Sequence, residues 1–149
     1  MRVVAQRCVA ARVEVGGEIT GAIGRGLVAF VACGKGDDEA ALAATVDKVL
    51  GLRVFEDEAG KMSRSLVDEG LALLVVSQFT LYGDVRRGRR PSFDDAEDPA
   101  LARPMLDRFV ARARDAGVTV AAGRFGADMR VFVENDGPVT ILIDSRKTF

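Results

Sequence analysis

The stretch of sequence that decides the fold is Leu27-Val28-Ala29-Phe30-Val31-Ala32-Cys33, which is apolar at every position. An uninterrupted apolar run of this length indicates a strand that is buried on both faces. A second run, 71–76, is also apolar and ends at Ser77. We therefore expect two buried strands, at 27–33 and 71–76, in a sheet that other elements cover.

Further strands are expected around these two runs. Apolar residues alternate along 9–15, which predicts a strand with one wetter face, and Gly16-Gly17 predicts a hairpin turn into 18–20. The remaining predicted strands lie at 53–55, 118–121, 129–134 and 139–143. The glycines between the early strands are interpreted as turn residues: Gly21, Gly24 and Gly26.

Two helices are predicted. Apolar side chains at helical spacing and an acidic first turn indicate a helix from about Asp37 to Leu50, with Gly51 just past its end. Asp98 as N-cap and proline at the next position begin the second helix, which Gly117 closes. Because strands and helices do not strictly alternate, we expect a mixed α/β fold in a single domain of residues 1–149.

Composition narrows the class of protein. Of the 149 residues, 48% are hydrophobic and 29% are charged, which is typical of soluble globular domains. No apolar run reaches the ~20 residues that a membrane-spanning helix requires, and the first residues lack the pattern of a signal peptide. We therefore expect a cytoplasmic protein. With 21 basic and 22 acidic residues, the net charge of −1 does not by itself indicate a nucleic-acid partner.

The chain contains no histidine. This excludes Ser-His-Asp and Cys-His nucleophile arrangements and histidine-ligated zinc sites. The two cysteines, Cys8 and Cys33, lie in apolar surroundings and are expected to be buried and reduced. Any catalysis must use hydroxyls, carboxylates, backbone dipoles or the substrate itself, and no metal ion or cofactor is expected.

Two polar segments interrupt the apolar pattern. Ser77-Gln78-Phe79-Thr80-Leu81 follows a buried strand, so its side chains either cap a turn or lie where open α/β sheets bind ligands. Asn135-Asp136-Gly137-Pro138-Val139-Thr140 lies between two predicted strands and reads either as a turn or as a rigid wall. A cis Gly-Pro bond would give such a wall two fixed carbonyl oxygens that sense the shape of a substrate's α-carbon.

A third segment is strongly basic. It contains Arg86, Arg87, Arg89 and Arg90, and an acidic run follows at 94–98. The segment is either a solvated loop whose charges cancel locally or an arm that contacts nucleic-acid phosphates.

Several of these motifs together resemble the D-aminoacyl-tRNA deacylases. The resemblance covers essentially the whole chain in order and spacing. Its motifs are Gln6-Arg7, Thr20-Gly21, Gly60-Lys61-Met62, Ser77-Gln78-Phe79-Thr80-Leu81, Arg90-Pro91-Ser92-Phe93, Gly123-Arg124-Phe125-Gly126-Ala127-Asp128-Met129 and Asn135-Asp136-Gly137-Pro138-Val139-Thr140.

The resemblance implies a fold and an activity. The fold would be a barrel-like core of mixed, strongly curved sheets with two main helices. The activity would be hydrolysis of the ester that joins a D-amino acid, and also glycine, to the terminal adenosine of tRNA, with rejection of L-aminoacyl-tRNA. The 2′-hydroxyl of that adenosine and backbone N–H groups would assist the reaction.

The resemblance also implies roles for particular residues. The protein would be a homodimer in which a cis Gly137-Pro138 enters the partner's active site as a chiral filter. DNA is not an expected partner. The expected catalytic residues are Ser77, Gln78, Phe79 and Thr80. The expected supporting residues are Arg7, Asn135 and Thr140, and Phe125 and Met129 are expected to bind the adenosine.

Two other functions stay open at this point. One is an esterase in which Thr80 is a covalent nucleophile, although no base is identifiable beside it in the sequence. The other is a module that binds the end of tRNA without catalysis.

Overall fold

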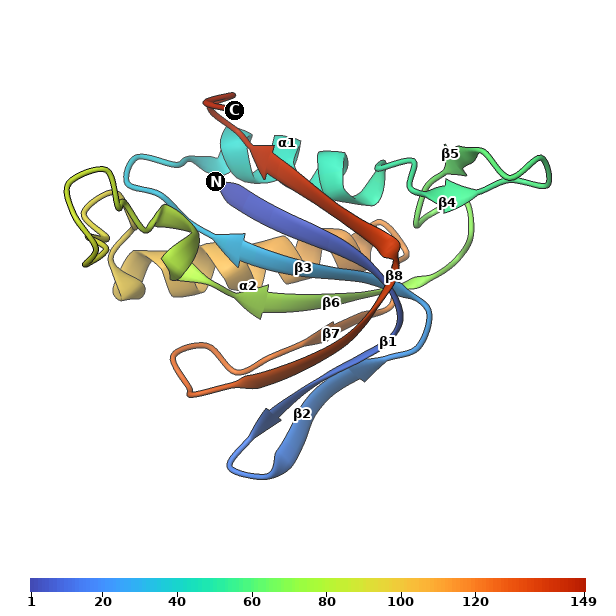
Figure 1. Cartoon of the computed structure of the whole chain (residues 1–149), viewed down its shortest axis with the longest axis horizontal. Helices are drawn as coiled ribbons and strands as arrows, with labels where there is room; N and C mark the ends of the chain where they lie inside the picture. Colours follow the sequence, from blue (N-terminus) through green and yellow to red (C-terminus); the bar gives the residue numbers. More distant parts are fainter.

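The computed structural model describes residues 1–149 and contains two α-helices, a short 3₁₀ helix and eight strands (Figure 1). In chain order they are β1 (Arg2–Val15), β2 (Glu18–Ile23), β3 (Gly26–Ala32), α1 (Glu39–Leu50), β4 (Phe55–Glu56), β5 (Met62–Arg64), β6 (Ala72–Ser77), η1 (Phe79–Tyr82), α2 (Pro99–Asp115), β7 (Val120–Ala122) and β8 (Arg130–Asp144).

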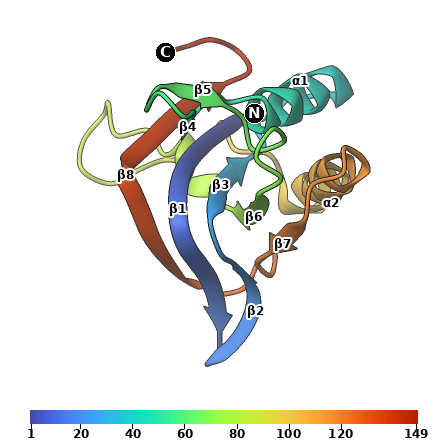
Figure 2. The same ribbon diagram turned by 90° about the vertical axis from the view of Figure 1, so that its right-hand side faces the viewer.

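The long strand β1 organises the main sheet. One edge of β1 pairs with β8 along residues 2–14, and the other edge is shared by β3 at 2–8 and β2 at 11–15. These pairs are antiparallel, whereas β3, β6 and β7 run parallel to one another. The sheet is therefore mixed, as the sequence predicts, and Figure 2 shows β1 and β8 curving across it.

The curvature brings the two ends of the sheet together. The hydrogen-bonded order runs β2-β1-β3-β6-β7, and yet β2 packs on β7. A Cβ atom at Gly21 of β2 would lie 2.5 Å from the carbonyl oxygen of Ala122, so only glycine permits this approach. The sheet is thus a nearly closed barrel.

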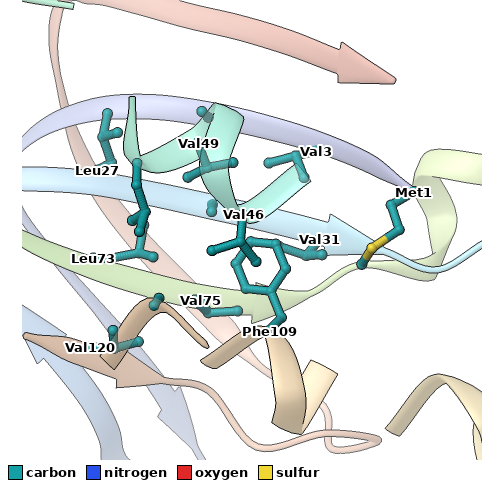
Figure 3. Packing of buried hydrophobic residues seen from close by; sticks show 14 of the residues in the cluster. Met1, Val3, Leu27, Val31, Val46, Val49, Leu73, Val75, Phe109 and Val120 are labelled. Carbon is teal, nitrogen blue, oxygen red and sulfur yellow. The ribbon is translucent and has the colours of Figure 1, made fainter. Parts of the chain in front are cut away.

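The hydrophobic core fills both faces of the parallel strands. On one face, α1 and α2 cover β3 and β6, and Val46 and Phe109 lie over Val31 and Val75 (Figure 3). On the other face, inside the curve of the sheet, Val28 belongs to a second buried cluster, whose other members are Cys8, Ala11, Val13, Leu74 and Val76. The prediction of strands buried on both faces is confirmed.

Both predicted helices are confirmed with their caps. The Asp38 side chain accepts a hydrogen bond from the N–H of Ala41 and begins α1, which ends at Gly51. Asp98 caps α2 in the same way through the N–H of Ala100, and Pro99 is its first residue. Neither helix is long and apolar enough to cross a membrane.

Several predicted boundaries are wrong. The strand predicted at 53–55 is only the two-residue β4, which pairs with an unpredicted β5. Gly21 and Gly26 lie in β2 and β3 and not in turns. Glycine is required at both positions because each strand approaches a neighbouring backbone closely. The strands predicted at 129–134 and 139–143 form one strand, β8, because both halves continue the same ladder with β1.

Gly26 provides a test of the close contact between β3 and β6. A Cβ atom at this position would lie 2.0 Å from the carbonyl oxygen of Ala72, whereas one at Gly24 would meet nothing within 4 Å. We expect Gly26→Ala to lower the free energy of unfolding by about 3 kcal/mol or more, as overpacking against a backbone does. Gly24→Ala is the matched control and should change it by less than about 0.5 kcal/mol in urea unfolding. Equal effects would contradict the close approach.

Candidate active site

A cavity lies where parallel strands end. The carboxyl ends of β3, β6 and β7 meet at one edge of the sheet, which is the usual place for ligands in such sheets. The cavity has a volume of about 490 Å³ and is bounded by α2 and the segment before it. Its walls include Val31–Cys33, Ser77–Phe79, Phe93, Glu97–Pro99, Ala102, Leu106 and Phe125.

The segment after β6 forms one wall of this cavity. The N–H of Gln78 donates to the carbonyl of Val31 at 2.8 Å, and the chain then enters η1 at Phe79. The Gln78 amide donates to the Thr80 hydroxyl. Phe79 is 57% exposed, and its ring stands edge-on to Phe93 with centroids 5.1 Å apart. Because η1 starts here, its first N–H groups have no partner within the helix and point out of its end.

The cavity contains no strong base next to a nucleophile. Thr80 follows the lining residues Ser77–Phe79 and does not itself line the cavity, and the hydrogen-bond partner of its hydroxyl is the neutral Gln78 amide. Cys33 lines the cavity, but burial raises the pKa of its thiol to about 11, so it is protonated at neutral pH and a poor nucleophile. Asp98 is engaged in capping α2. The site therefore supports positioning and main-chain hydrogen bonding better than side-chain nucleophilic attack.

The segment 135–140 forms a bulge in β8. Pairing with β1 passes from Thr140 opposite Gln6 to Asn135 opposite Cys8, so residues 136–139 protrude from the ladder. The expectation of a turn between two strands is thus corrected to a bulge within one strand. The Gly137-Pro138 peptide bond is cis, and both residues are exposed.

Side chains at the base of the bulge hold its shape through hydrogen bonds. The Asn135 amide donates to the carbonyls of Arg7 at 2.9 Å and Val139 at 3.0 Å. Thr140 accepts a hydrogen bond from the Gln6 amide at 3.2 Å. These contacts tie both ends of the bulge to β1.

Arg7 is a buried arginine beneath the bulge. Its Nη1 donates to the carbonyl of Val54 at 2.6 Å, and its Nε lies 2.9 Å from the carboxylate of Asp136. A Cβ atom at Gly137 would lie 3.1 Å from Nη2 of Arg7. Arg7 therefore supports Asp136 and Gly137 from within the same chain.

The expected site residues fall into two separate groups. Arg7 is opposite Leu27, whereas Ser77 is opposite Val31, four residues further along β3. At 3.3 Å per residue, this places the bulge ~13 Å along the strand from the cavity wall. Gly137 and Pro138 are not among the residues that line the cavity.

The two residues expected to bind adenosine are also divided. Phe125 lines the cavity, with the guanidinium of Arg103 5.7 Å from its ring centroid. Met129 packs against the second buried cluster, and its sulfur faces Gly123 at 2.7 Å from the position of a Cβ there. It does not line the cavity.

The arginine-rich loop lies outside the cavity. Arg86 pairs with Asp84 at 2.6 Å, and hydrogen bonds from Arg86 lower the pKa of that carboxyl to about 2. Arg87, Arg89 and Arg90 are exposed, and no carboxylate pairs with them. Local charge cancellation therefore applies to Arg86 and leaves the other three arginines unpaired.

Sequence reasoning missed several cavity residues, notably Phe93, Glu97 and Ala102. The start of α2 at Asp98-Pro99 was a usable signal, but nothing local indicated which strand ends it faces. No group of three or more acidic or cysteine side chains comes together in a way that could hold a metal ion.

The fold is that of a mixed α/β protein with a cavity at the ends of parallel strands. The family model of the D-Tyr-tRNA(Tyr) deacylases matches residues 4–144. The chain therefore belongs to the D-Tyr-tRNA(Tyr) deacylase family.

Individual relatives agree with this assignment. Proteins named D-aminoacyl-tRNA deacylase from Sorangium cellulosum and Symbiobacterium thermophilum are 64% and 58% identical, covering all of this chain and 100% and 99% of theirs. A solved structure named c-Myc DNA unwinding element binding protein is 40% identical with a TM-score of 0.91, covering 97% of this chain and 98% of its own. A structure described as a probable eukaryotic D-amino acid tRNA deacylase shares the fold, with 22% identity, a TM-score of 0.84 and coverage of 95% and 97%.

Proposed function

We propose that this protein hydrolyses the ester between a D-amino acid and the terminal adenosine of tRNA, in the cavity at the ends of β3 and β6. The observation that carries the proposal is the position of Ser77–Phe79, which belong to a segment of the resemblance, as a wall of that cavity. The cytoplasm, where tRNA is aminoacylated, is the proposed place of action.

The chemistry needs little from side chains. An aminoacyl ester is already activated, so positioning and stabilisation of the oxyanion are the main requirements. The free N–H groups at the start of η1, those of Phe79 and Thr80, are proposed to meet the oxyanion. The 2′-hydroxyl of the adenosine is proposed to activate water, because the Thr80 hydroxyl has only the Gln78 amide beside it.

Chirality is proposed to be read by the bulge of a second copy of the chain. In its own chain the bulge is ~13 Å along the strand from the cavity wall, but Gly137 and Pro138 are exposed and available to a partner. Their carbonyl groups would collide with the side chain of an L-aminoacyl group and leave room for that of a D-aminoacyl group. Glycine has no side chain to collide, so glycyl-tRNA should also enter.

The remaining residues have supporting roles in this proposal. Arg7, Asn135 and Thr140 hold the bulge, as their contacts with it support. Phe125, which lines the cavity, stacks on the adenine. Met129 supports the adenosine site through its contact with Gly123.

Activity with matched substrates tests the reaction. We expect D-tyrosyl-tRNA to be hydrolysed at least about a thousandfold faster than L-tyrosyl-tRNA, a difference of ~4 kcal/mol in transition-state stabilisation.

Thr80→Ala should keep substantial activity, and a D-aminoacyl ester on a 2′-deoxy terminal adenosine should react poorly. A folded Thr80→Ala variant with normal substrate affinity and no activity would instead support a Thr80 nucleophile. Binding without any hydrolysis by the wild type would support the idle binding module.

Mass in solution tests the composite site. One chain has a mass of 15.9 kDa, and we expect sedimentation to find a homodimer at the concentrations at which the protein is active. Activity per chain should fall when dilution separates the subunits, because each cavity would lose its partner's bulge. A fully active monomer would contradict this arrangement.

The three unpaired arginines of the loop are proposed to contact tRNA phosphates. Changing Arg86, Arg87, Arg89 and Arg90 to Gln should weaken binding of whole tRNA and flatten its salt dependence, measured by filter binding at several salt concentrations. Hydrolysis of a D-aminoacyl-adenosine should stay nearly unchanged. Equal losses on both substrates would show that the loop shapes the cavity. Competition by DNA of equal length checks the expectation that DNA is not a partner.

A further inference from the structure

A second cavity adjoins the first on the far side of Phe125. It has a volume of about 250 Å³, and it shares Ser77, Leu106 and Phe125 with the larger cavity. Its other walls include Val75, Arg103 and Arg124. A ligand group attached to a molecule in the first cavity can therefore reach the second past Ser77.

Two unpaired arginines border this second cavity. Arg103 lies on α2, and Arg124 lies two residues after the end of β7; both are exposed, and neither has a carboxylate within 4.0 Å. Two arginines further along the same helix behave differently, because Arg108 pairs with Glu39 and Arg112 with Asp47 at 3.1 Å each. The guanidinium groups at the cavity are thus free to bind an anion.

One carboxylate also lines the second cavity. Asp107 lies four residues after Arg103 on α2, the spacing at which helical side chains meet, and yet the two form no ion pair. Two guanidinium groups and one carboxylate line the second cavity, so its lining carries a net positive charge. Planar guanidinium groups match the geometry of phosphate oxygens.

We propose that Arg103 and Arg124 bind the phosphodiester on the 5′ side of the terminal adenosine. This inference rests on the proposed function and places the ribose beside Ser77, which lines both cavities. The 3′-ester and the 5′-phosphate are attached to the same ribose, so a ribose at the shared wall directs one into each cavity. The position of Arg103 over the Phe125 ring places its charge at the boundary between them. The loop at 86–90 lines neither cavity and would meet phosphates further along the tRNA.

A pair of small ligands isolates the contribution of one phosphodiester. Calorimetry at low salt compares adenosine with adenosine 5′-methylphosphate, which differs by a single negative charge. We expect the wild type to bind the phosphodiester about tenfold more tightly than adenosine, and the double variant Arg103→Gln, Arg124→Gln to lose this preference. Affinity for adenosine itself should not change. Arg53→Gln is the matched control, because Arg53 is exposed, unpaired and lines neither cavity.

Three results would overturn the inference: no preference in the wild type, a preference that survives the double substitution, or an equal loss of adenosine affinity. The last would mean that the arginines merely shape the wall around Phe125. Hydrolysis of D-aminoacyl-adenosine by the wild type tests the proposed function separately. If that hydrolysis fails while the phosphodiester preference follows Arg103 and Arg124, the phosphate site stands and the proposed reaction falls.

Discussion

The parallel pairing of β3 with β6 is the constraint on which the rest of the structure depends. The pair is apolar on both faces, so it requires α1 and α2 on one side and the curved β1, β2 and β8 on the other. The backbones approach so closely at Gly26 that no side chain fits there. Because the strands run in the same direction, their ends open at one edge, and the cavity forms where the ladder stops and α2 begins.

The chemistry of the cavity follows from the lack of a strong base next to a nucleophile. Its thiol is protonated, one of its carboxylates caps a helix, and the nearby Thr80 hydroxyl is paired with an amide. An activated ester is a substrate that such a site can serve, because main-chain N–H groups and correct placement replace a base. Unpaired positive charge is found around the cavity, at Arg87, Arg89, Arg90, Arg103 and Arg124. This distribution suits a substrate whose reactive end is small and whose body is a polyanion.

The bulge of β8 differs from the cavity, because it is an exposed protrusion and not a hollow. Asn135, Thr140 and Arg7 support it from below, and its exposed tip consists of two residues with little or no polar side chain. A rigid surface of this kind fits the proposed discrimination by shape. Its distance from the cavity of its own chain is the physical reason for proposing that two copies complete one site.

The sequence by itself determined the elements whose signals are local. The caps at Asp38 and Asp98 and the apolar spacing specify both helices, the runs 27–33 and 71–76 specify the buried strands, and the motifs at 77–81 and 135–140 specify the family. Tertiary structure alone decided how these parts meet. The ladder with β1 merged two predicted strands into β8, and close packing placed Gly21 and Gly26 inside strands. The packing of α2 and of the segment before it brought Arg103 and Glu97 to the strand ends. The sequence did not show this, because contacts between residues distant in the chain leave no periodic trace in it.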